Sequence, residues 1–218
     1  MSELFIVVGC EELPARFTTI AVDGIQRNIV KLLKGIDHGE IQTWSTPRRI
    51  AIAIQDVASG SPQQVQLVTG PPVERAFVNG EPTKAALGFA RGRGVDPNDL
   101  EIIESPRGKV VAARVKTGGE STTSRIQKGL EQAILNIDFG RTMRWGDGTI
   151  SWARPIHRLI AVYDGILIST SVGDVQSSLV DVGHRLSPEP FSSTTSQQWL
   201  NSLQSNFVEA NQQQRRLK

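Results

Sequence analysis

The sequence predicts an α+β protein in which hairpin-containing mixed sheets pack against helices. Three observations support this fold class. Apolar residues recur at helical spacing over residues 14–34. Isoleucine alternates with other residues over 50–54, a period of two that is typical of a strand. Two apolar runs flank Asp164-Gly165, a pair that tolerates the positive φ angles of a two-residue hairpin turn.

The N-terminal elements follow from local signals. Leu4 to Val8 is a short apolar run, which predicts a buried strand. Glu11-Glu12-Leu13-Pro14 ends this strand, and proline suits the first turn of the next helix. That helix is expected near residues 14–34, and Gly35 closes it.

Two strands are expected next, at residues 41–45 and 50–54, and the second should bury only one face. Thr46-Pro47 separates them. Residues 58–72 are rich in Gly, Ser, Pro and Gln. We therefore expect a surface loop or linker there.

The later elements are bounded by turn residues and by Ser or Thr at helix starts. In order we expect a helix from Pro82 that ends at Arg91–Gly94, strands at 100–103 and 110–115, a helix at 121–137, a hairpin of 156–163 and 166–172, and a last helix capped by 192–195 with Trp199, Leu203 and Phe207 on one side.

Length and composition bound the protein class. A chain of 218 residues can bury a sizeable core. We expect an α+β domain over residues 1–190 and a C-terminal helix and polar tail over 191–218. The net charge is only +2, so any case for nucleic-acid binding rests on local clusters. A single cysteine, no secretory signal and no apolar run of membrane length favour a cytoplasmic protein with no membrane contact.

Arginine-bearing clusters are the candidate contacts with an RNA or a partner subunit. Arginine offers a planar fork that matches phosphate or carboxylate, and Trp145 and Trp152 could supply a stacking surface. The alternative is structural, with arginines bonded to nearby carbonyls and tryptophans in the core. The candidate contact residues are Arg48, Arg49, Arg91, Arg93, Arg144, Trp145, Arg154, His184 and Arg185.

No residue is assigned a catalytic or metal-binding role. His157 and His184 lack the spacing of a zinc site and anchor no triad. Glu11-Glu12 is explained by a helix N-terminus, and Cys10 by a structural thiol. The sequence has neither a phosphate loop nor Gly-x-Gly-x-x-Gly after a strand, so we expect this chain to bind no cofactor and no ATP.

Short motifs along residues 3–185 together resemble the N-terminal region of the β subunit of the bacterial two-subunit glycyl-tRNA synthetase. Their order and spacing carry the resemblance, because each motif alone is weak. They are Glu-Glu-Leu-Pro (11–14), Thr-Pro-Arg-Arg (46–49), Gly-Pro-Pro (70–72), Pro-Thr-Lys-Ala-Ala with Gly-Phe-Ala-Arg-Gly (82–86, 88–92), Met-Arg-Trp-Gly (143–146), Arg-Pro-Ile (154–156) and Gly-His-Arg (183–185).

The chain departs from the family pattern in places. Leu186-Ser187-Pro188 follows Gly-His-Arg where the family usually has an aromatic residue. The family's β subunit is several times longer and continues into an HD-type helical domain and an anticodon-binding region. A fragment, a truncation and a free-standing copy are all compatible with this length.

The resemblance implies a glycine–tRNA ligase that works as a complex of two α and two β chains. Glycine activation with ATP then belongs to the α subunit, while the β subunit binds tRNA(Gly) and completes the complex. The N-terminal region of the family is similar to the editing-type module of the phenylalanyl-tRNA synthetase β subunit. Two alternatives stay open: a free-standing trans-editing deacylase of mischarged tRNA, and a stand-alone RNA-binding module.

We predict that the chain alone does not form glycyl-adenylate, because its sequence has no nucleotide-binding motif. Glycine-dependent ATP–pyrophosphate exchange is the measurement, made with the purified chain and no α subunit. Exchange above the background without glycine would overturn the prediction.

Overall fold

The computed structural model describes residues 2–78, 80–106, 108–145 and 148–217. The chain divides into two compact units. Unit 1 contains Met1–Ser61 together with Glu120–Lys218, and unit 2 contains Pro62–Gly119. The expected α+β class is confirmed, since sheets and helices occur in both units. The expected mixed sheets are wrong, because the described strands pair in antiparallel ladders. The expected single domain over 1–190 is instead interrupted by unit 2, and 191–217 packs within unit 1.

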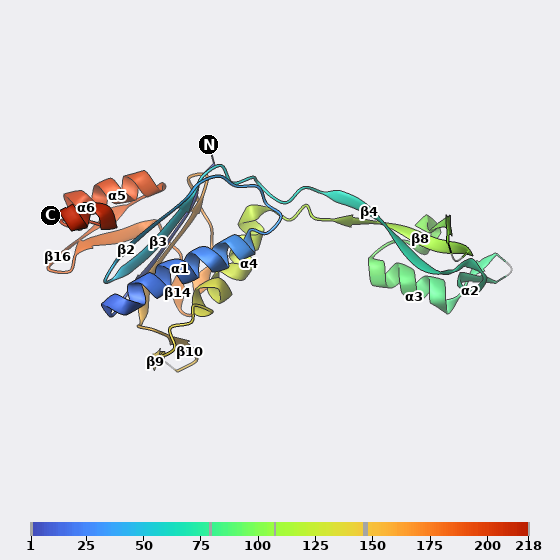
Figure 1. The fold of residues 1–218 in the computed structure, drawn as a ribbon, viewed down its shortest axis with the longest axis horizontal. Helices are drawn as coiled ribbons and strands as arrows, with labels where there is room; N and C mark the ends of the chain where they lie inside the picture. Colours follow the sequence, from blue (N-terminus) through green and yellow to red (C-terminus); the bar gives the residue numbers. More distant parts are fainter. Residues whose placement is uncertain (1, 79, 107, 146–147, 218) are drawn as a thin grey trace. The chain divides into compact units, whose positions relative to one another are not determined.

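Unit 1 is organised around one antiparallel sheet, which Figure 1 shows between helices. Its strand order is β12-β11-β1-β3-β2, and β1 is central because it pairs with both β11 and β3. All seven residues of β1 are buried. The strands are β1 (Leu4–Cys10), β2 (Ile41–Thr46), β3 (Arg49–Ile54), β11 (Ile156–Tyr163) and β12 (Ile166–Leu167).

Helices cover both faces of this sheet. On one face, α1 (Ala15–Leu32) and α4 (Thr122–Leu135) pack closely, since a Cβ added to Gly129 of α4 would overlap Leu32 Cδ1 of α1. On the other face, α5 (Ser196–Ser205) contributes Trp199 and Leu203 to a second core cluster. The expectation that residues 50–54 bury one face is therefore wrong, because β3 is buried throughout.

Small hairpins complete unit 1. The turn at Asp164-Gly165 is confirmed, with φ of +51° and +76°. The strand expected over 166–172 is divided into β12 and β13, because the chain leaves β11 after Ile168 and forms a hairpin with β14. The additional strands are β9 (Met143–Trp145), β10 (Ile150–Trp152), β13 (Ser171–Val172), β14 (Val175–Gln176), β15 (Val180–His184) and β16 (Ser187–Ser192).

The C-terminal segment differs from expectation in two places. Thr195 caps α5 by accepting a hydrogen bond from Gln198 N. The sequence predicts Phe207 on one side of this helix with Trp199 and Leu203, but Phe207 follows the helix end and is 81% exposed. The polar residues that were expected as a tail form α6 (Gln212–Leu217), whose Gln212 Nε2 donates to Ser45 Oγ at 2.7 Å.

Unit 2 corrects the expected loop over 58–72, because Gln64–Pro72 is strand β4. Backbone hydrogen bonds to β8 hold this strand in place. Its apolar residues Val65 and Leu67 are exposed, so the sequence shows no alternation of buried and exposed residues that would indicate a strand. Its sheet has the order β4-β8-β7. The other elements are α2 (Val73–Ala76), β5 (Phe77–Val78), β6 (Glu81–Pro82), α3 (Lys84–Arg93), the 3-10 helix η1 (Pro97–Asp99), β7 (Glu101–Ser105) and β8 (Gly108–Thr117).

A buried carboxylate joins the elements of unit 1. Asp181 on β15 is 1% exposed and accepts from Arg49 Nε at 3.0 Å and Arg158 Nε at 3.0 Å. It also accepts from Trp199 Nε1 at 2.8 Å and from Val182 N at 2.8 Å. One side chain therefore links β3, β11, β15 and α5.

We predict that Asp181→Ala lowers the free energy of unfolding by about 3–5 kcal/mol, because it leaves buried Arg49 without its carboxylate. Urea unfolding followed by tryptophan fluorescence measures the change. Glu12→Ala is the matched control, since its ion pair with Arg185 is exposed at both ends and should contribute little. Equal effects of the two substitutions would contradict this role for Asp181.

Candidate functional site

The end of the unit 1 sheet carries a hollow that combines several of the candidate contact residues. Its volume is about 310 Å³. It brings Arg48, from the turn before β3, together with His184 and Arg185, although more than 130 residues of sequence separate them. The hollow is lined by Glu12, Thr46, Pro47, Arg48, Arg49, His184, Arg185 and Val208.

Arg49 is the exception among these candidates. Its side chain is buried, donates to Asp181 and also donates to the carbonyl oxygens of Val182 and Gly183. A buried guanidinium with these partners cannot reach a tRNA or another subunit. The expectation of a contact role for Arg49 is therefore wrong, and its role is to hold β15 against β3.

Two carboxylates pair with the remaining arginines of the hollow. Arg48 Nη2 lies 3.2 Å from Glu11 Oε2, and Arg185 Nη1 donates to Glu12 Oε1 at 3.1 Å. The glutamates precede α1 and its first turn contains no acidic residue. The interpretation of Glu11-Glu12 as acids of a helix N-terminus is therefore wrong, because long-range ion pairs hold them instead.

The charges at this end of the sheet have clear electrostatic effects. His157 Nε2 lies 2.9 Å from Glu11 Oε1, and this hydrogen bond and the charge of Arg48 lower the pKa of the Glu11 carboxyl. Glu11 therefore stays ionised at neutral pH. Burial raises the pKa of the Cys10 thiol to about 12, although Arg158 opposes the shift. The thiol is thus buried and neutral, which is unsuited to nucleophilic chemistry.

The β9–β10 hairpin carries a second group of candidates. Arg144 is exposed on β9, Trp145 is half-buried against the core, and Arg154 Nη1 lies 3.8 Å from Met143 Sδ. Trp152 is fully buried and donates from Nε1 to Ile134 O at 2.9 Å, so a stacking role for this residue is wrong. Gly146, the last residue of the Met-Arg-Trp-Gly motif, lies outside the described residues.

Arg91 and Arg93 belong to unit 2 and lie at the C-terminal end of α3, where both are exposed. Gly94 ends the helix with φ of +65°, as a glycine after a helix commonly does. Basic residues are favoured at a helix C-terminus in any case. The structure therefore leaves both roles available to these two arginines.

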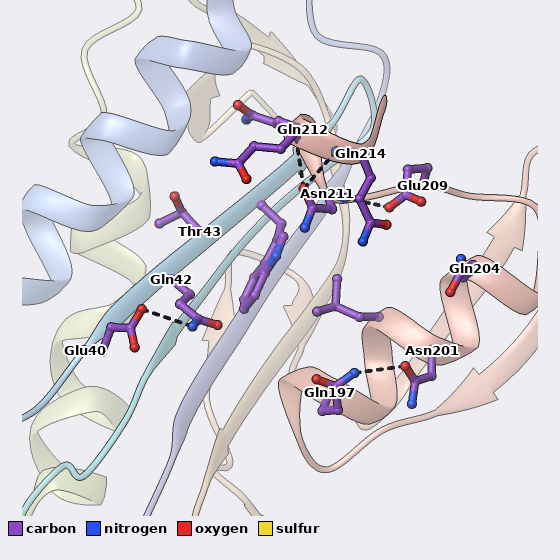
Figure 2. A pocket seen from close by; sticks show the side chains of 13 residues that line it. Glu40, Gln42, Thr43, Gln197, Asn201, Gln204, Glu209, Asn211, Gln212 and Gln214 are labelled. Atoms are coloured by element: carbon purple, nitrogen blue, oxygen red, sulfur yellow. Dashed lines mark hydrogen bonds between the residues drawn. The ribbon is translucent and has the colours of Figure 1, made fainter. Parts of the chain in front are cut away.

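A second hollow, of about 630 Å³, lies between β2, α5 and α6 and was not predicted. Figure 2 shows amide side chains facing it from all three elements, with Gln197 bonded to Asn201 and Gln42 bonded to Glu40. Amide groups both donate and accept hydrogen bonds, so this surface suits uncharged polar groups. The many Gln and Asn residues after residue 196 are the sequence feature that could have indicated this hollow.

Within the described ranges, no group of three or more His, Cys, Asp or Glu side chains is placed to hold a metal ion. None of the described helices is both long and apolar enough to cross a membrane. The features that the structure does present include exposed arginines and several surface hollows, one of which, of about 750 Å³ in unit 2, is lined in part by Arg93.

The comparison with protein families agrees with the motif order. The model of the family described as the glycyl-tRNA synthetase beta subunit matches residues 4–218. The chain therefore belongs to the glycyl-tRNA synthetase β subunit family.

Curated relatives support this family. The glycine–tRNA ligase β subunit of Syntrophotalea carbinolica is 37% identical over 211 residues, which cover 95% of this chain and 31% of the relative. The β subunit of Citrifermentans bemidjiense is 38% identical over 186 residues, or 84% of this chain and 27% of the relative. The chain thus spans less than a third of the length of these relatives.

Proposed function

We propose that this chain is the N-terminal part of a glycine–tRNA ligase β subunit, which supports ATP-dependent glycyl-tRNA(Gly) formation through subunit assembly and tRNA binding. The observation that carries the proposal is the family match along residues 4–218. Glycine activation takes place on the α subunit, and the complete complex, a cytoplasmic tetramer of two α and two β chains, uses the ATP.

The chain's role in this proposal is binding rather than chemistry. Arginine and tryptophan are the residue types most enriched at interface hot spots. Exposed Arg144 beside half-buried Trp145 provides such a pair on a hairpin held by the core of unit 1. Arg91 and Arg93 provide exposed positive charge on unit 2, which suits a phosphate backbone.

We also propose that this α+β region is similar in fold to the editing-type module of the phenylalanyl-tRNA synthetase β subunit. We assign no deacylase activity to it. Glycine is the smallest amino acid, so a site that excludes by size already rejects larger ones. The relatives are glycine–tRNA ligase β subunits, which supports the synthetase function over a free-standing deacylase or RNA-binding module.

We predict that Arg144→Ala leaves the melting temperature nearly unchanged, because the side chain is exposed on β9. The same substitution should weaken binding of the α subunit or of tRNA(Gly) by about 1 kcal/mol, roughly fivefold in Kd. Isothermal titration with each partner measures the change.

Lys128→Ala is the control for Arg144→Ala, since it also removes one exposed positive charge from unit 1. It should leave both affinities unchanged. If Arg144→Ala unfolds the chain, the residue is structural, and if it binds both partners like the unaltered chain, the contact role is wrong.

A further inference from the structure

The chain passes between the two units twice, and regular pairing is interrupted at both passages. The chain leaves unit 1 after Ser61 and returns to it at Glu120. On the unit 1 side, Ser61 N donates to Glu120 O at 3.1 Å. On the unit 2 side, the ladder of β4 and β8 begins with the pair Gln64 and Thr117. Among the described residues, the short segments between these paired regions take part in no ladder or bridge.

These segments are Pro62-Gln63 and Gly118-Gly119, and we call them the joint. Pro62 has no N–H group, so it cannot donate to a ladder. Gly118 and Gly119 have φ of +81° and +78°, in the left-handed region that glycine populates readily. Hinges in proteins are short segments that absorb a change in φ and ψ. The composition of the joint therefore suits a change of backbone direction.

Unit 1 holds its end of the connection firmly. The side chain of Thr122 is buried, its Oγ1 donates to Ala58 O at 2.6 Å, and its N donates to Ser59 O at 2.8 Å. The two strands are in close contact, since a Cβ added to Gly60 would lie 2.7 Å from Glu120 O. The connection is thus fixed as far as the joint.

Arg125 of α4 gives both strands a second support. Its Nη1 donates to Lys34 O at 2.6 Å, and its Nε donates to Glu120 Oε2 at 3.2 Å. Its Nη2 donates to Ser61 Oγ at 3.5 Å. One guanidinium therefore ties each strand to unit 1 next to the joint.

Unit 2 is equally well ordered beyond the joint. β4 and β8 stay in register from the pair Gln64 and Thr117 to the pair Thr69 and Ala112. β8 also carries Val111 into the small core of unit 2. A short unpaired joint therefore lies between two regions held by hydrogen bonds, so rotation at the joint would turn unit 2 as one body.

We propose that the joint is a hinge, at which unit 2 changes its orientation as a rigid body within milliseconds or faster. The alternative is a fixed bulge that sets one orientation. The inference concerns motion of this chain and does not rest on the proposed function. Its consequence for that function is that Arg91 and Arg93 of unit 2 can adjust to a bound tRNA(Gly) without a change in the core of unit 1.

Backbone residual dipolar couplings of the weakly aligned chain test the hinge, because they average over motions as slow as milliseconds. Two units that form one rigid body share one alignment tensor, whereas a hinge makes the two tensors differ. We expect the degree of alignment of unit 2 to be lower than that of unit 1 by about one third or more. One common tensor for both units of the unaltered chain would overturn the inference.

A disulfide across the joint gives a matched comparison. A Cβ added to Gly119 would lie 3.8 Å from Gln63 Cβ, which matches the usual Cβ separation in a disulfide. In the double variant Gln63→Cys, Gly119→Cys, oxidation should give both units one tensor, and reduction should restore the difference. A cysteine at positive φ is strained, but the oxidised and reduced forms share this strain. Native Cys10 is buried and does not compete for the disulfide.

The double variant Val65→Cys, Lys116→Cys is the control, since these residues pair directly within the ladder of β4 and β8. Its two units should keep different tensors in both redox states. The hinge is wrongly placed if the oxidised joint variant keeps two tensors, or if the oxidised control acquires one. A failure of the chain to bind tRNA(Gly) would count against the proposed function alone, because the couplings are measured without tRNA.

Discussion

The buried carboxylate of Asp181 is the constraint on which the arrangement of unit 1 depends. Four donors meet it, from Arg49, Arg158, Trp199 and the adjacent amide of Val182. A charge in the interior is costly unless it is paired and hydrogen-bonded, so these partners have little freedom to move. The network therefore fixes where β15 and α5 lie against the central sheet.

The network also holds the elements that precede two exposed apolar residues. Leu186 comes just after β15, which Asp181 and Arg49 hold, and Phe207 comes just after α5, which Trp199 holds. The buried polar contacts thus hold both β15 and α5 against the central sheet. Unit 2 has its own small core around Val111, and its exposed arginines Arg91 and Arg93 do not take part in the Asp181 network.

Much of the fold could be predicted because its signals are local. Apolar periodicity and capping residues located α1, α4 and α5, and Asp-Gly located the β11–β12 turn. Strand β4 was missed because most of it is exposed, so no buried alternation marks it. The role of Arg49 was missed because its partner, Asp181, is 132 residues away and forms no motif with it.

Amide hydrogen exchange of the unaltered chain and of Asp181→Ala tests the central claim most directly: the buried Asp181 network holds β15 and α5 against the central sheet. We predict that Asp181→Ala speeds exchange at residues 180–184 and 196–205 and leaves 62–119 unchanged. Unchanged exchange at 180–184 and 196–205 would contradict the account.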